Sequence, residues 1–93
     1  MSLNRAEIEN KIRSMMIERL NLSIAPNELT TDAALFGPES KLDLDSIDAL
    51  EITLGMEEAF QFHIDEREIG KNQFRNLGTL VAFVEQKLAA KSE

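Results

Sequence analysis

The chain has 93 residues, of which seventeen are acidic and ten basic, so its formal net charge is −7 at pH 7. A surface of this charge repels a phosphate backbone, which excludes nucleic acid as a partner. The chain has no cysteine, so it can form neither a disulfide framework nor a thiolate zinc site. The length suits a single domain over residues 1–93, and no stretch has the apolar core of a signal peptide or membrane insertion. We therefore expect a monomer in the cytoplasm.

The first predicted element is an amphipathic helix over residues 6–20. Its apolar positions are Ile8, Ile12, Met15, Met16 and Leu20. These positions recur at spacings of three and four, which is the period of one helix face. A long connection follows, with turn signals at Pro26 and Gly37-Pro38. Its apolar residues are Leu22, Ile24, Leu29, Leu35 and Phe36. A free linker would not carry them, so we expect the connection to be pinned across the bundle.

The next helix is predicted over residues 46–60, and its helical wheel carries two apolar stripes. The first stripe is Ile52, Met56, Ala59 and Phe60; the second, on the opposite side, is Ile47, Leu50 and Leu54. The carboxylates beside the second stripe are Asp48, Glu51, Glu57 and Glu58. One stripe is enough to hold a surface helix to a bundle. The second stripe therefore favours a partner-binding face, with packing against the long connection as the alternative.

Two further helices complete the predicted fold. A short one over residues 65–70 is expected to begin at Asp65 and end near Gly70. The last is expected over residues 77–90, with Asn76 as its cap. Its inward-facing residues are Leu80, Val81, Phe83, Val84 and Leu88. With no convincing strand, these elements predict an all-α fold: a small irregular four-helix bundle with a long first loop and a short third helix.

The negative charge is concentrated in the middle of the chain. Residues 39–68 contain ten acids, against only Lys41 and Arg67 as bases. Such a cluster indicates either a solvated helix face or a docking surface for basic partners.

Ser46 stands at the predicted start of the second helix. It is compatible with a simple cap, in which Asp45 is the N-cap residue and Asp48 the third helical residue. It is also compatible with an attachment point, since unpaired amides and the positive end of the helix dipole favour a phosphate there. A catalytic serine is excluded because the only histidine, His63, is seventeen residues downstream, beyond the far end of the same helix. No catalytic residue and no metal site are predicted.

The motif Asp45-Ser46-Ile47-Asp48, followed by Glu51, resembles the signature of the acyl carrier proteins. Ile64-Asp65-Glu66 and Leu77-Gly78-Thr79-Leu80 resemble the starts of that family's third and fourth helices, so the resemblance covers nearly the whole chain. It implies a carrier and not an enzyme. In the family, a phosphopantetheinyl transferase uses coenzyme A to attach 4′-phosphopantetheine to the serine that matches Ser46. Acyl groups are then carried as thioesters on the terminal thiol.

The resemblance also implies partners. It assigns the second stripe and Glu51 to the face that partner enzymes contact, and Asp45 to the residue that helps the transferase's metal-bound complex to form. The full predicted partner-binding set is Asp45, Ile47, Asp48, Leu50, Glu51, Leu54 and Glu58. The expected partners are the transferase and the acyl-transfer and acyl-chain-modifying enzymes of fatty-acid, polyketide or related lipid biosynthesis, through basic docking surfaces.

Departures from the family pattern flank the serine. Residues 37–41 are additional loop length, and Leu42-Asp43-Leu44 stands where many relatives have Leu-Gly-x. They leave open whether the chain is a housekeeping or a specialised carrier. Two other functions remain as alternatives: a peptidyl or aminoacyl carrier of the same fold, and an unmodified acidic helical adaptor.

Overall fold

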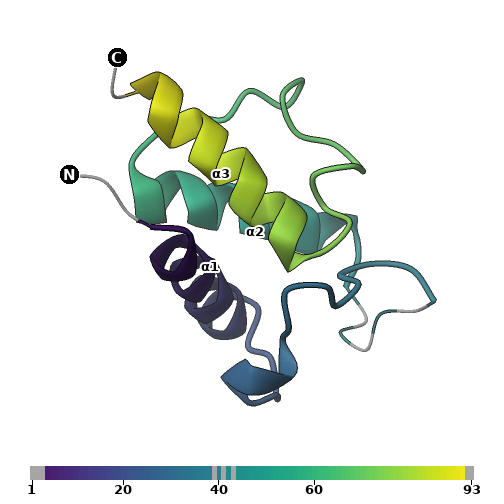
Figure 1. The fold of residues 1–93 in the computed structure, drawn as a ribbon. Helices are drawn as coiled ribbons and strands as arrows, with labels where there is room; N and C mark the ends of the chain where they lie inside the picture. Colours follow the sequence, from purple (N-terminus) through teal and green to yellow (C-terminus); the bar gives the residue numbers. More distant parts are fainter. Residues whose placement is uncertain (1–3, 39, 41, 43, 92–93) are drawn as a thin grey trace.

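The structure is a computed structural model, and it describes residues 4–38, 40, 42 and 44–91. Its elements are α1 (Arg5–Arg19), the short 3-10 helix η1 (Pro26–Glu28), α2 (Ser46–Phe60) and α3 (Leu77–Lys91) (Figure 1). Within the described ranges, the only β pairing is an isolated antiparallel bridge between Ala34 and Asn76. The all-α prediction is therefore confirmed, and the three long helices lie within one residue of their predicted bounds.

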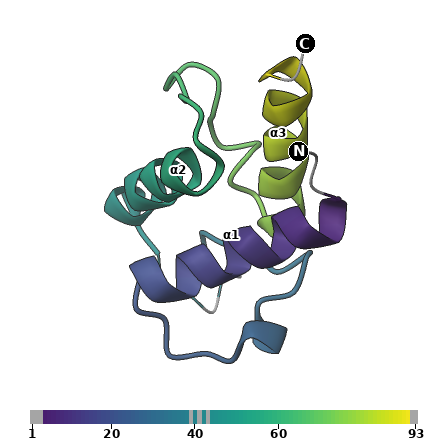
Figure 2. The same ribbon diagram turned by 90° about the vertical axis from the view of Figure 1, so that its left-hand side faces the viewer.

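Helix α1 is the centre of the arrangement. It begins at a capping box, in which the Glu7 amide donates to Asn4 Oδ1 at 2.8 Å and the Asn4 amide donates to Glu7 Oε1 at 3.0 Å. Figure 2 shows α1 running beneath both other helices, and it packs against each of them. Helices α2 and α3 do not approach one another as closely. The segment that joins them, residues 61–76, arches over the space between them (Figure 2).

The core is formed by one face of each helix together with the long connection. Its buried apolar residues are Ile8, Ile12, Met16, Leu29, Leu35, Ile52, Met56, Phe60, Ile64, Leu77, Leu80, Val81, Phe83 and Val84. Partly buried residues packed against it include Met15, Leu20, Leu22, Ile24, Phe36, Ala59 and Leu88. The predicted inward faces of all three helices are thus confirmed.

The long connection is pinned across the bundle, as predicted. Leu29 and Leu35 are fully buried in the core. The connection is also held by hydrogen bonds: Arg13 Nε donates to the Leu29 carbonyl at 2.9 Å, and the Gly78 amide donates to the Thr31 carbonyl at 2.8 Å. These bonds tie it to both α1 and α3.

A glycine allows α1 and α2 to approach closely. Gly55 is buried on the side of α2 that faces α1. A Cβ atom placed there would collide with the Met15 side chain and would lie 3.1 Å from Arg19 Cδ. The missing side chain therefore leaves the space that the Met15 side chain, and next to it that of Arg19, occupies.

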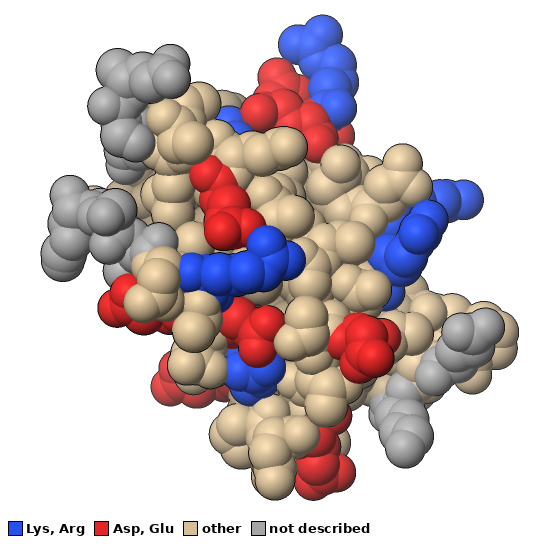
Figure 3. All heavy atoms as spheres, in the orientation of Figure 1, with Lys and Arg blue, Asp and Glu red and all other residues tan. Residues whose placement is uncertain are grey.

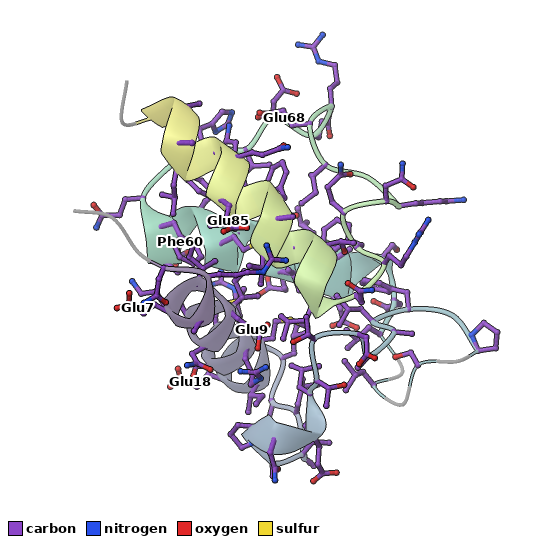
Figure 4. All side chains as sticks on the ribbon, viewed as in Figure 1. Glu7, Glu9, Glu18, Phe60, Glu68 and Glu85 are labelled. Atoms are coloured by element: carbon purple, nitrogen blue, oxygen red, sulfur yellow. The ribbon has the colours of Figure 1, made fainter. Side chains whose placement is uncertain are left out.

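The prediction of a short helix over residues 65–70 was wrong. Asp65 does act as a cap, since its Oδ1 accepts from the Arg67 amide at 2.9 Å, but Glu68 closes the turn at once. The Glu68 amide donates to the Asp65 carbonyl at 2.8 Å, and Glu68 Oε2 accepts from the Asp65 amide at 2.8 Å. A second closed turn follows from Gly70 to Gln73. An isolated turn fixes several backbone dihedral angles for a single hydrogen bond, which is unfavourable. These separate turns therefore do not extend into a helix. Figure 4 shows Glu68 on this arch, outside the helices.

Candidate functional site

Ser46 is the first residue of α2, and its hydroxyl is not used to cap the helix. The cap is supplied by Asp45, whose Oδ1 accepts from the amides of Ile47 at 3.0 Å and Asp48 at 3.2 Å. Asp48 Oδ2 in turn accepts from the Asp45 amide at 2.9 Å, which completes the predicted capping box. The exposed Ser46 side chain makes no hydrogen bond with any described residue. The helix start is therefore built without the serine.

This cap changes one expectation about a phosphate on Ser46. Free amides at a helix start would have attracted the anion, but the Asp45 carboxylate already occupies those of Ile47 and Asp48. The next amide, that of Ala49, donates to the Asp45 carbonyl at 3.1 Å. A phosphate here would meet two carboxylates rather than a row of unpaired amides.

Ser46 opens onto a pocket of about 910 Å³. The pocket is lined by Ala34, Phe36, Gly37, Pro38, Asp45, Ser46, Ala49, Gly70, Lys71, Asn72, Phe74 and Arg75. The rings of Phe36 and Phe74 pack edge to face on its wall, with centroids 5.8 Å apart. Volume and composition suit a small-molecule site with an apolar wall and a few polar groups.

The sequence did not identify the residues that line this pocket. Its two loops are more than thirty residues apart and are joined by bonds such as that from the Leu35 amide to the Arg75 carbonyl, at 3.3 Å. The available signal was weaker: two loop phenylalanines, and two cations in residues 69–76, which contain no acid.

The second apolar stripe of α2 lies in solvent. Ile47 is 69% exposed, Leu50 59% and Leu54 37%. On the opposite side, Ile52 and Met56 are fully buried. The predicted division of α2 into a core face and an outer face is confirmed, and the exposed strip does not pack against the long connection. We call Ile47, Leu50 and Leu54 the outer strip.

The carboxylates beside the outer strip are not bare. Arg19 reaches over from the end of α1, with its Nε 2.9 Å from Glu51 Oε2 and its Nη1 3.2 Å from Glu58 Oε1. The hydrogen bonds that Arg19 donates to Glu58, and then that to Glu51, raise the pKa of its guanidinium above its ordinary value. Sequence reasoning missed Arg19 because it precedes its partners by 32 and 39 residues.

The far end of α2 carries no catalytic partner for Ser46. His63 is 85% exposed there, with its Nδ1 3.2 Å from Glu57 Oε2. Glu57 also accepts a hydrogen bond from the Ile64 amide at 2.7 Å, so it secures the exit from the helix. Among the described residues, no three side chains are grouped so as to hold a metal ion. None of the described helices is long and apolar enough to cross a bilayer.

Comparison with known proteins agrees with this geometry. The family model described as a phosphopantetheine attachment site matches residues 10–84. The chain is 33% identical over 85 residues to an acyl carrier protein of Borreliella burgdorferi, which covers 91% of this chain and 98% of that one. Its structure is similar to the solution structure of a holo acyl carrier protein from Nitrosomonas europaea, with a TM-score of 0.73, 35% identity and coverage of 87% and 95%.

A second solved structure shares the fold alone. It contains a carrier protein from Agrobacterium tumefaciens in complex with an engineered glycine:[carrier protein] ligase of Bradyrhizobium japonicum. The TM-score is 0.70 at 19% identity, with coverage of 85% of this chain and 97% of that one. Taken together, the capped serine, the helical fold and these relatives show that the chain belongs to the acyl carrier protein family, whose members carry phosphopantetheine and are not enzymes.

Proposed function

We propose that Ser46 is the residue to which 4′-phosphopantetheine is attached. The observation that carries this proposal is the exposed, unbonded Ser46 hydroxyl, held at the start of α2 by a cap that does not use it. The residue also falls within the part of the chain that the family model matches. The attached group supplies a terminal thiol, which a chain without cysteine lacks, and on which an acyl group is held as a thioester.

The chain presents the hydroxyl but does not activate it. No described residue hydrogen-bonds Ser46 as a base, and a serine without a base is a weak nucleophile. The phosphopantetheinyl transferase must therefore supply the group that takes the Ser46 proton. Asp45 Oδ1 is used by the cap, whereas Oδ2 has no hydrogen bond to a described residue. Oδ2 is thus placed to help form the transferase's metal-bound complex.

The partner surface in this proposal is the outer strip with its neighbouring carboxylates. Exposed apolar anchors beside negative charge complement an apolar patch rimmed by basic residues. The acidic contributors are Asp45, Asp48, Glu51 and Glu58. The partners are the transferase and the acyl-transfer and acyl-chain-modifying enzymes of fatty-acid or related lipid biosynthesis. Because coenzyme A is the donor, we place this exchange in the cytoplasm, with residues 1–93 acting as one monomeric carrier domain.

Intact mass tests the attachment. Incubation with coenzyme A and a phosphopantetheinyl transferase should add the mass of one phosphopantetheine to the wild type and to Ser14→Ala, a control at an exposed serine of α1. Ser46→Ala should gain nothing while keeping a wild-type circular dichroism spectrum. Modification of Ser46→Ala would overturn the assignment. Competition between fatty-acyl and aminoacyl donors for the loaded arm then distinguishes an acyl carrier from an aminoacyl carrier.

A further inference from the structure

Cations are scarce on this chain, and nearly all that the structure describes are engaged. The ion pairs are Arg5–Glu85, Arg13–Glu9, Arg19 with Glu51 and Glu58, Arg67–Asp65 and Lys87–Glu68. Lys11 donates to the Ala59 carbonyl at 3.2 Å and lies over the Phe60 ring. Among the lysines and arginines with described side chains, only Lys71 and Arg75 have no partner of either kind.

These two cations are presented from a held backbone. Both belong to residues 69–76, the part of the arch next to α3, which contains no acid. The Arg75 carbonyl accepts from the Leu35 amide at 3.3 Å, and the Gln73 carbonyl accepts from Thr79 Oγ1 at 2.7 Å. The loop is therefore tied to the long connection and to α3. Charges on a held frame lose less freedom when they bind a ligand than charges on a free loop.

Lys71 and Arg75 line the same 910 Å³ pocket as Ser46. The aromatic wall of Phe36 and Phe74 belongs to that pocket too, so an apolar surface continues into a basic rim. Figure 3 shows Lys and Arg side chains gathered on the right of this face, where tan surface surrounds them. The other blue side chains on this face each lie beside red ones (Figure 3).

An anion attached at Ser46 would lie beside negative charge on α2. The charges closest to Ser46 along the chain are the carboxylates of Asp45 and Asp48, and the cap already uses the amides of Ile47 and Asp48. Among the described residues that line the pocket with Ser46, the only cations that could balance such a phosphodiester are Lys71 and Arg75. The carboxylate of a short dicarboxylic acyl group, carried at the end of the arm and folded back along the apolar wall, would meet the same two cations.

We propose that Lys71 and Arg75 form a binding site for an anionic oxygen group carried by the arm on Ser46. This inference rests on the attachment proposed above. The phosphodiester and a cargo carboxylate share the required chemistry, and the consequence in either case is an arm that docks in the pocket rather than extending into solvent.

NMR of the full chain can distinguish the two sources. The side-chain resonances of Lys71 Nζ and Arg75 Nε are followed through four states: unmodified, holo, butyryl-loaded and succinyl-loaded. Butyryl and succinyl have the same chain length and differ by a carboxylate in place of a methyl. If the phosphodiester binds, both resonances shift on conversion to the holo form and stay shifted with butyryl. If the carboxylate binds, they shift only with succinyl.

A pair of double variants with equal loss of charge provides the control. Lys71→Gln/Arg75→Gln removes the rim, whereas Arg5→Gln/Arg67→Gln removes two exposed cations outside the pocket. The rim variant should change the ³¹P shift of the holo form, or raise the pKa of the succinyl carboxyl toward its free value. The control variant should leave both at their wild-type values.

Each other outcome overturns the inference. Equal changes in both double variants would mean a general charge effect. Normal loading with no response at Lys71 or Arg75 would remove the anion site and leave the attachment intact. A wild type that does not accept phosphopantetheine would remove the proposed attachment and the anion site together.

Discussion

The two faces of α2 carry similar side chains and meet opposite environments. Ile52 and Met56 are fully buried, whereas Ile47 and Leu50, in the first two turns of the same helix, are 69% and 59% exposed. The inner face holds the helix against the bundle. The outer face contributes little to folding, so its apolar residues are available for binding. If the outer face binds partners as proposed, mutations on the two sides of the helix should change stability and recognition independently.

Met56→Ala should give the largest change in stability. Because the Met56 side chain is fully buried, truncation loses its burial and leaves a cavity, at a cost of about 2–4 kcal/mol in the free energy of unfolding. Leu50→Ala is the matched variant on the outer face and should stay within about 0.5 kcal/mol of wild type. Urea unfolding measures both. Equal losses would mean that the outer strip is part of the core.

Asp45→Ala should have an intermediate effect on stability, since it removes the N-cap of the whole helix α2 and not a residue of one face. The carboxylate accepts from two amides of α2, and loss of an N-cap side chain costs roughly 1 kcal/mol. Ser46→Ala, one residue along, should cost much less because its hydroxyl bonds no described residue. Thermal unfolding of the two variants side by side checks this. A larger loss for Ser46→Ala would show that the serine is structural.

Glu51→Lys should weaken recognition at only a small cost in stability, because the ion pair with Arg19 that it breaks is partly exposed. It reverses a charge beside the outer strip, so the KM of the transferase for this carrier should rise, and the rise should shrink as salt increases. Glu66→Lys makes the same charge change on the arch, away from the strip, and should have a smaller effect. The new lysine would also repel Arg19 and the basic groups of the partner. Glu51→Gln removes the negative charge without adding a positive one, so it measures the lost attraction alone. Equal KM values for the two lysine variants would show that only net charge matters.

The smallest expected effect is a pH dependence that involves neither face of α2. Hydrogen bonds from Arg13 and then Thr31 hold the pKa of Glu9 below its ordinary value of 4.5. A carboxyl whose pKa is lowered by folding stabilises the fold above its unfolded pKa, and this contribution is lost as the pH falls through the folded pKa. Glu9→Gln should therefore flatten the fall of Tm from neutral pH towards about pH 3, while Glu18→Gln should not. An unchanged slope would contradict this role of Glu9.

Local signals were sufficient to predict the three long helices and the cap at Asp45. The periodicity of α1, α2 and α3 and the cap at Asp45 depend on residues within a few positions of one another, and each was found from the sequence. The segment at 65–70 misled because its capping residues close separate turns, so the correct local signal led to the wrong element. The pocket and the Arg19 contacts were out of reach. They depend on which loops and helices meet, and no pattern along the chain records that.

Arg19 gives the outer face a property that a bare acidic patch lacks. Arg19 passes Gly55 and already bonds Glu51 and Glu58. A basic partner that docks there must therefore displace Arg19 from these carboxylates before its own cations can bind them. Replacing a cation that is already paired with a carboxylate releases less free energy than pairing a bare carboxylate. Cations of unrelated proteins therefore bind this surface only weakly. The partner that succeeds is one whose basic groups match the positions of both carboxylates while its apolar surface covers the strip. Arg19 is thus a resident competitor, and the surface it occupies selects for geometry more than for charge.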